Sequence, residues 1–145
     1  MSKAALAEFA DKVSEIMRVI ANEFAKKQTA GFHKIKLTMP QIFILDFLYR
    51  DGESNMTDMA HHMNVTTAAI TGLVDKLVRD RYAVRRTDSA DRRIIRVRLT
   101  KAGSGIIKNI IKHKRKMIMD IFGKITQAER EYYLKILMHI REHIK

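Results

Sequence analysis

Arginine side chains gather in a short stretch near the middle of the chain, where they outnumber acidic side chains. Seven basic residues lie between positions 85 and 101, against two acidic ones: Arg85, Arg86, Arg92, Arg93, Arg96, Arg98 and Lys101, with Asp88 and Asp91. A guanidinium donates in a planar fork that fits phosphate oxygens, and it can enter the minor groove of DNA, where negative potential is focused. A merely solvated face usually mixes both signs, so this excess favours a surface that binds a polyanion.

The acidic residue Asp91 stands directly before Arg92 and Arg93. A carboxylate at this place can orient a neighbouring guanidinium through two parallel hydrogen bonds. The stretch therefore predicts an arginine that is held in a defined direction.

A second stretch, at residues 66–72, carries mostly small and hydroxyl-bearing side chains. Small residues in the first half of a helix let its backbone approach the base edges in the major groove, and threonine offers a hydroxyl for hydrogen bonds and a methyl for the thymine methyl. Taken alone, the stretch also suits a plain helix cap. The basic stretch that follows favours the DNA-binding interpretation, with an outward face of Thr67, Ala68, Thr71, Asp75 and Lys76.

Helices must position these two stretches, and apolar residues at three- and four-residue steps predict where they lie. Thr38 with Gln41, and Thr126 with Glu129, have the spacing of a capping box. The predicted helices are 3–28 with Gly31 marking the end, 41–50 after Thr38, Asn55 or Thr57 to Asn64, Thr66 to about Arg81, 101–122 after Thr100, and Thr126 to Ile144. The helix at 41–50 is apolar nearly all round, so we expect it to be buried.

The apolar period changes from 3.6 to 2 after Tyr82, which predicts two strands. In residues 94–99 the apolar Ile95, Val97 and Leu99 alternate with Ile94, Arg96 and Arg98. Residues 82–87 are the expected partner, with Val84 facing inward. The turn-forming residues 88–91 between them predict a hairpin with an arginine-rich outer face.

This order of elements is typical of a winged helix-turn-helix. We expect a mainly α fold with a small β-hairpin wing, in which residues 38–100 bind DNA. Residues 1–34 and 101–145 form long amphipathic helices that need an apolar partner. They predict a helical dimerisation region.

The composition excludes several other classes of protein. The 145 residues suit one domain, and a net charge of +12 favours nucleic acid or an acidic surface as partner. No cysteine is present, which excludes disulfides, thiol nucleophiles and thiol-based redox sensing. No apolar run approaches the length of a membrane span and no signal peptide is evident, so we expect a cytoplasmic protein without membrane contact.

Two further sets of residues were weighed as functional sites. His139 and His143 share one helix face, but a surface pair near a helix C-terminus explains this spacing better than a metal site, so no metal or cofactor is expected. The basic run on helix 101–122 fits either a DNA-facing field or the solvated side of a dimer helix, and both interpretations stay open: Lys108, Lys112, Lys114, Arg115 and Lys116.

These motifs together resemble the MarR family (multiple antibiotic resistance regulators) of transcriptional regulators. The resemblance rests on residues 88–93 leading into Leu99-Thr100-Lys101-Ala102-Gly103, which is similar to the wing signature ending in Leu-Thr-x-x-Gly. Residues 65–77 resemble the recognition helix, and Leu37-Thr38-x-x-Gln41 resembles the opening of the second helix. The resemblance covers essentially all of residues 1–145, and it implies that they form a single MarR-like domain.

The resemblance implies a homodimer whose first helix and last two helices interlock. It implies that Arg93 enters the minor groove and that Asp91 holds it. Proteins of this family usually repress genes, and many release DNA when a small anionic or phenolic ligand binds. Some members sense oxidants through cysteine, a mechanism that cannot apply to this chain.

The sequence therefore predicts a sequence-specific regulator that binds a pseudo-palindromic duplex as a dimer and acts as a ligand-released repressor. The expected DNA-binding residues are Thr66, Thr67, Ala68, Thr71, Gly72, Lys76, Arg86, Asp91, Arg92, Arg93 and Arg96. The alternatives are a sequence-independent architectural DNA-binding protein and a winged module for RNA or another protein. An enzyme is not expected, because the chain lacks a glycine-rich phosphate loop, a nucleophile elbow, a zinc ligand set and a carboxylate pair.

Overall fold

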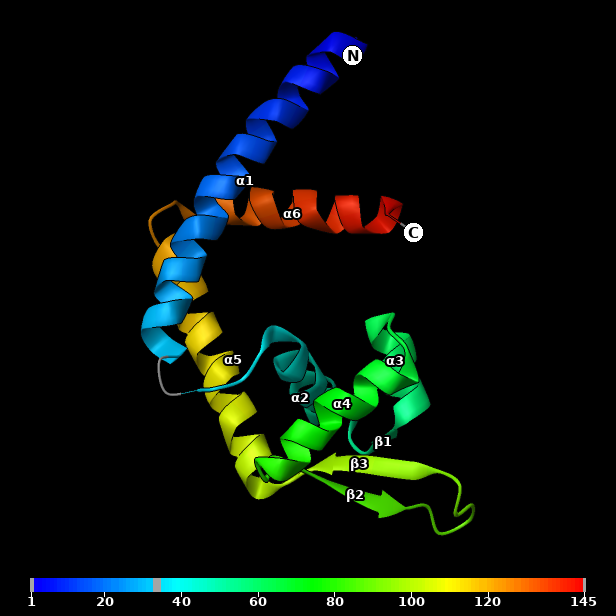
Figure 1. Cartoon of the computed structure of the whole chain (residues 1–145). Coiled ribbons are helices and arrows are strands. Elements are labelled where there is room, and N and C mark those ends of the chain that lie inside the picture. Colours follow the sequence, from blue (N-terminus) through cyan, green and yellow to red (C-terminus); the bar gives the residue numbers. More distant parts are fainter. Residues whose placement is uncertain (1, 33–34, 145) are drawn as a thin grey trace. The chain divides into compact units, whose positions relative to one another are not determined.

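The computed structural model describes residues 2–32 and 35–144, and the chain divides into two compact units. The winged unit comprises residues 34–112, and the helical unit comprises residues 1–33 and 113–145. The boundary falls within the fifth helix, which contributes to both units (Figure 1).

The described elements follow the predicted order (Figure 1). In the winged unit they are α2 (Met39–Asp51), β1 (Ser54–Asn55), α3 (Met56–Met63), α4 (Thr67–Arg79), β2 (Ala83–Thr87), β3 (Ile95–Leu99) and the first half of α5 (Lys101–Phe122). The helical unit holds α1 (Lys3–Phe32), the remainder of α5, and α6 (Gln127–His143). The predicted mainly α fold with a β-hairpin wing is confirmed. The assignment of the parts to DNA binding and dimerisation stays a prediction.

Two elements differ from the sequence prediction. Helix α1 continues through Gly31 to Phe32, because a glycine weakens a helix without ending it and no proline follows. The two-residue strand β1 was not predicted, since two residues are too few to show a period.

Side-chain caps begin several helices at the predicted residues. The Thr38 N–H donates to Gln41 Oε1 at 2.8 Å before α2. Asn55 Oδ1 accepts from the Asp58 N–H at 2.8 Å, and Thr66 Oγ1 accepts from the Ala69 N–H at 3.2 Å. These caps satisfy N–H groups that have no partner inside the helix, and so they fix where α2, α3 and α4 begin.

The core of the winged unit lies between its helices and the base of the hairpin. Its buried apolar residues include Ile44, Leu45 and Leu48 of α2, Met59 and Ala60 of α3, Ile70, Val74 and Leu77 of α4, Ala83, Val97, Ile107 and Ile110. Helix α2 is buried on one face only, contrary to expectation. Phe43 is 53% exposed, because the buried positions repeat at helical spacing on the opposite face.

The three strands form one antiparallel sheet in the order β1-β3-β2. Ala83 lies opposite Leu99, and Arg85 lies opposite Val97, so these side chains share the face toward the core. Val84 lies opposite Arg98 on the other face and is 37% exposed. The prediction that Val84 faces inward is therefore wrong, because the register gives that place to Ala83.

The Leu-Thr-x-x-Gly motif joins the wing to α5. Thr100 Oγ1 donates to the Arg81 carbonyl at 2.7 Å and accepts from the Gly103 N–H at 3.0 Å, so it caps α5 as predicted. The Thr100 N–H donates to the Tyr82 carbonyl at 3.0 Å. A Cβ atom on Gly103 would lie only 1.9 Å from the Tyr82 carbonyl oxygen, so this approach requires glycine.

The α5–α6 connection of the helical unit is held by an arginine. Arg130 Nη1 donates to the Phe122 carbonyl at 3.0 Å and also to the carbonyl of Ile125, which satisfies groups at the end of α5. Thr126 and Glu129 form the predicted capping box of α6. No helix among the described residues combines the length and apolarity that crossing a membrane requires.

The two glycines of α5 provide a stability test with an internal control. Gly103→Ala is expected to lower the free energy of unfolding by about 1–3 kcal/mol, because the methyl group meets the Tyr82 backbone. Nothing lies within 4 Å of a Cβ on Gly105, so Gly105→Ala should leave stability unchanged or raise it. Urea unfolding followed by circular dichroism measures both, and equal effects of the two substitutions would contradict the assigned role of Gly103.

Candidate nucleic-acid interface

Helix α4 presents its predicted small-residue face to solvent. Ile70, Val74 and Leu77 are buried and hold the helix on the winged unit. The outward residues predicted to bind DNA are all exposed: Thr66, Thr67, Ala68, Thr71, Gly72 and Lys76. The geometry therefore leaves this face free for a partner.

The hydroxyl of Thr71 is partly used within the helix. Thr71 Oγ1 donates to the Thr67 carbonyl at 2.9 Å, one turn earlier. Its proton is therefore engaged, while its oxygen lone pairs and its methyl remain available. Such a side chain suits acceptance from an amino group or contact with a thymine methyl.

Nothing in the described part of the chain requires a glycine at position 72. It is exposed in the middle of α4, and nothing lies within 4 Å of a Cβ built on it. An exposed helix interior prefers alanine over glycine by about 1 kcal/mol. The missing side chain opens space directly above the α4 backbone.

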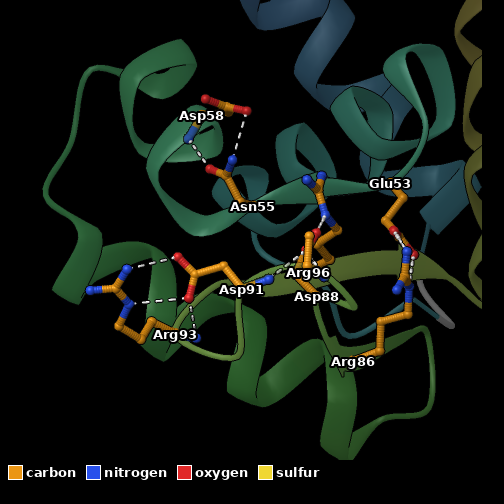
Figure 2. Close-up of polar contacts among 9 residues, drawn as sticks. Glu53, Asn55, Asp58, Arg86, Asp88, Asp91, Arg93 and Arg96 are labelled. Carbon is orange, nitrogen blue, oxygen red and sulfur yellow. Dashed lines mark hydrogen bonds and ion pairs between the residues drawn. The ribbon is translucent and has the colours of Figure 1, made fainter.

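The wing turn holds Arg93 in a fixed direction (Figure 2). Arg93 Nε and Nη2 each lie 3.1 Å from one oxygen of Asp91, and the Arg93 N–H donates to Asp91 Oδ1 at 3.0 Å. These bonds lower the pKa of the Asp91 carboxyl. The Arg93 side chain is nevertheless 91% exposed, so the predicted bidentate pair presents a held cation to solvent.

Asp88 organises the same turn from its other end (Figure 2). Its carboxylate pairs with Arg96 and accepts from the N–H groups of Ala90, at 2.8 Å, and Asp91, at 3.1 Å. The bond from Arg96, followed by the two backbone bonds, lowers the pKa of Asp88 to about 2. The charged form of Asp88 therefore stabilises the turn that presents Arg93.

Arg86 and Arg96 are both engaged with carboxylates of the winged unit. Arg86 Nε donates to Glu53 Oε2 at 2.7 Å, and Arg86 Nη2 pairs with the other oxygen (Figure 2). This fork lowers the pKa of Glu53 and raises that of Arg86. Sequence reasoning predicts that both arginines bind DNA. In the structure each is paired with a carboxylate of the winged unit, and their part in DNA binding stays a prediction.

A contact that sequence reasoning missed links the wing to α4. Arg85 Nη1 lies 2.5 Å from Asp75 Oδ1, and Arg85 Nη2 donates to the Thr71 carbonyl at 3.3 Å. The opposite charges were visible in the sequence, but no local spacing connects positions ten residues apart across a turn.

Other cations of the winged unit form no ion pair among the described residues. Lys76, Arg92, Arg98 and Lys101 are exposed. Arg92 lies in the turn and Lys76 on α4, both as predicted, while Arg98 was not among the expected DNA-binding residues. These four cations are therefore available to bind an anionic partner.

The remaining sets singled out in the sequence add no site. The rings of His139 and His143 meet edge to face at 4.6 Å, and His143 Nδ1 lies 2.8 Å from the His139 carbonyl oxygen. In residues 2–32 and 35–144 no three metal-ligating side chains come together. The basic residues of α5 that were singled out are exposed, which leaves both interpretations of that run open.

Comparisons with known proteins find relatives among transcriptional regulators with a helix-turn-helix. The sequence model of the MarR family matches residues 37–95, from before α2 into β3. The uncharacterized HTH-type transcriptional regulator YsmB of Bacillus subtilis is 27% identical over 145 residues, covering 100% of this chain and 99% of that protein. Residues 37–95 therefore form a region of the MarR family type.

Solved structures show the same fold over nearly the whole chain. A MarR family protein from Bacillus stearothermophilus matches with a TM-score of 0.82 at 20% identity, over 99% of this chain and 98% of the other. MepR of S. aureus, solved bound to ethidium bromide, matches with a TM-score of 0.70 at 20% identity, over 91% and 96% of the two chains.

The pKa of Asp88 gives a prediction about pH. Its folded pKa of about 2 lies below its ordinary 3.8, so the ion pair with Arg96 stabilises the wing above that ordinary value and is lost as pH falls toward 2. A carbon NMR titration of the Asp88 carboxyl should show this low midpoint. In Arg96→Gln the midpoint should rise, because the first cause of the shift is removed, and an unmoved midpoint would contradict the pairing.

Proposed function

We propose that the protein is a sequence-specific regulator of transcription that binds double-stranded DNA as a dimer and represses until a small ligand releases it. The observation that supports this most is the exposed, carboxylate-held Arg93 beside the small-residue face of α4. The Arg93 side chain can reach into the narrow minor groove. The small residues of α4 let the helix backbone lie close to the base edges in the wider major groove.

In this proposal α4 enters the major groove and the wing enters the adjacent minor groove. Thr66, Thr67, Ala68, Thr71 and Gly72 face the base edges and the phosphates at the start of α4. Arg93, positioned by Asp91, enters the minor groove. Lys76 and Arg92 neutralise phosphates, whereas Arg86 and Arg96 act indirectly by fixing the shape of the wing.

The apolar faces of the helical unit support the dimer. Helix α6 has no buried residue, and large apolar side chains on α1 and α6 are exposed, among them Leu6, Phe9, Ile16, Met17, Ile20, Tyr133, Ile136, Leu137 and Ile140. Contiguous apolar surface of this kind marks an interface. A second copy of the chain is the proposed occupant, and its two α4 helices would read half-sites about 34–36 Å apart.

The match of residues 37–95 to the MarR family model supports repression and release by a ligand, which are usual in that family. The ethidium-bound MepR structure supports the idea that this fold accepts a small planar molecule. The net charge of +12 favours an anionic or phenolic ligand for this chain over a cation such as ethidium.

A sequence-independent architectural protein is the second candidate. Lys76, Arg92, Arg98 and Lys101, which form no ion pair in residues 2–32 and 35–144, favour it, because phosphate contacts alone carry no sequence information. Binding to the inverted repeat nearest the gene, measured against random duplex at fixed salt, separates the two candidates. A regulator should prefer its site by about 10³ or more, and equal affinities would establish the architectural role.

Arg93→Ala tests the wing contact. Operator affinity is expected to fall by about 1–3 kcal/mol, the worth of one good arginine contact, with folding and dimerisation unchanged. Arg18→Ala, an exposed arginine of α1 without an ion pair among the described residues, is the control and should bind as the parent does. Fluorescence anisotropy titration measures both. Unchanged affinity in Arg93→Ala would show that the wing does not meet the duplex.

Gly72→Ala is expected to have opposite effects on the stability of the free protein and on its affinity for DNA. The substitution should stabilise the free protein by up to about 1 kcal/mol, because alanine favours the helix and meets no neighbour. The same methyl group should weaken operator binding, since it fills the space above α4. Thermal unfolding and a DNA titration measure the two effects, and a variant that is stabilised but binds DNA normally would rule out close approach at Gly72.

A further inference from the structure

The outer part of the wing has little apolar packing to hold it against α4. Only Ala83 of β2 and Val97 of β3 are buried, and both lie at the base or middle of the hairpin. A groove of about 420 Å³ lies between α4 and the wing, with Met56, Thr71, Thr87 and Ile95 in its lining. Pairing of β3 with β1 and the Arg86–Glu53 fork hold the other side of the wing. On the side of α4 the open groove contributes few close contacts, so packing there leaves the distance between wing and helix weakly defined.

One polar connection spans this groove. The Arg85 guanidinium reaches from β2 to two groups one turn apart on α4, the Thr71 carbonyl at 3.3 Å and Asp75 Oδ1 at 2.5 Å. A planar guanidinium held at two points has a fixed direction. Because Arg85 lies opposite the buried Val97, its backbone is itself anchored.

We propose that the Asp75–Arg85 pair, with the Thr71 carbonyl, sets the angle between recognition helix and wing and thereby the spacing at which the protein reads two adjacent grooves. Arg85 and Asp75 are positioning residues in this proposal and do not themselves contact bases. The inference rests on the proposed DNA-binding function.

Replacing Asp75 distinguishes a positioning role of this residue from a general effect of its negative charge. Asp75 lies on the exposed side of α4, where a negative charge repels DNA. If charge alone mattered, Asp75→Asn would strengthen binding to every duplex. If the pair positions the wing, the same substitution weakens binding to the operator.

The experiment combines a DNA-free distance measurement with a binding titration. The chain has no cysteine, so Thr67→Cys and Ser89→Cys place one spin label on α4 and one in the wing turn. Labelled chains are diluted with unlabelled chains so that only the two labels of one chain are measured. Double electron–electron resonance spectroscopy then gives the distribution of distances between the labels at positions 67 and 89. The parent should show one narrow distribution, and Asp75→Asn should broaden it. Asp75→Arg combined with Arg85→Asp should narrow it in part, because the swap restores the ion pair but not the bond to the Thr71 carbonyl.

In the titration Asp75→Asn is expected to lose about tenfold in operator affinity, equal to about 1.4 kcal/mol, and less on random duplex. Asp80→Asn removes an exposed acid that forms no ion pair among the described residues, and it should bind at least as tightly as the parent. Thermal unfolding should be nearly unchanged in both, since a partly exposed pair contributes little to stability.

Two results would overturn the proposal: an unchanged distance distribution in Asp75→Asn, or tighter operator binding by that variant. Failure of the parent protein to bind any duplex would instead overturn the proposed function. The distance measurement still tests the Asp75–Arg85 connection in that case, because it is made without DNA.

Discussion

Repulsion between arginines is the constraint that shapes the wing. The antiparallel register places Arg86 directly opposite Arg96, and like charges on facing positions of two strands destabilise their pairing. Glu53 takes up the fork of Arg86, and Asp88 takes up Arg96. The hairpin therefore depends on carboxylates supplied by its own turn and by the segment before β1.

The same pairing divides the arginines of the wing into two groups. Arg85, Arg86, Arg93 and Arg96 each have a carboxylate partner, while Arg92 and Arg98 have none among the described residues. Arg93 differs from the other paired arginines because its partner lies two residues away in the turn, so pairing leaves its side chain in solvent. Its carboxylate directs the cation outward, whereas Asp75 and Glu53 bind Arg85 and Arg86 to the body of the unit and Asp88 binds Arg96 within the hairpin.

Sequence reasoning found those features that local spacing encodes. The capping residues Thr66 and Thr126 lie where they were predicted, because a cap needs only a hydroxyl and an N–H three residues later. The Asp91–Arg93 pair could also be predicted, since the two residues are only two positions apart. The hairpin followed from the change of period after Tyr82, and helix α4 followed from apolar residues at helical spacing before it.

The features that sequence reasoning missed depend on register and on contacts between distant segments. One residue of register decides whether Val84 or Ala83 faces the core, and both residues are apolar. Glu53 and Arg86 are separated by 33 positions, so only the fold brings them together. The sequence could therefore not show that Arg86 and Arg96 are paired with carboxylates of the chain, and their assignment to DNA stays a prediction.

Pairing also bears on the choice between regulator and architectural protein. A chain with a net charge of +12 and an unpaired arginine hairpin would bind any duplex tightly, and tight non-specific binding lowers the ratio that defines specificity. Each carboxylate paired with a wing arginine reduces the positive charge that drives non-specific binding. It also holds the guanidinium in one geometry, so the group stays available for a directed contact. In the proposed function, recognition by the wing thus depends more on the position of Arg93 than on the number of cations. Such an arrangement benefits a protein that must distinguish its site and gives no advantage to one that coats DNA.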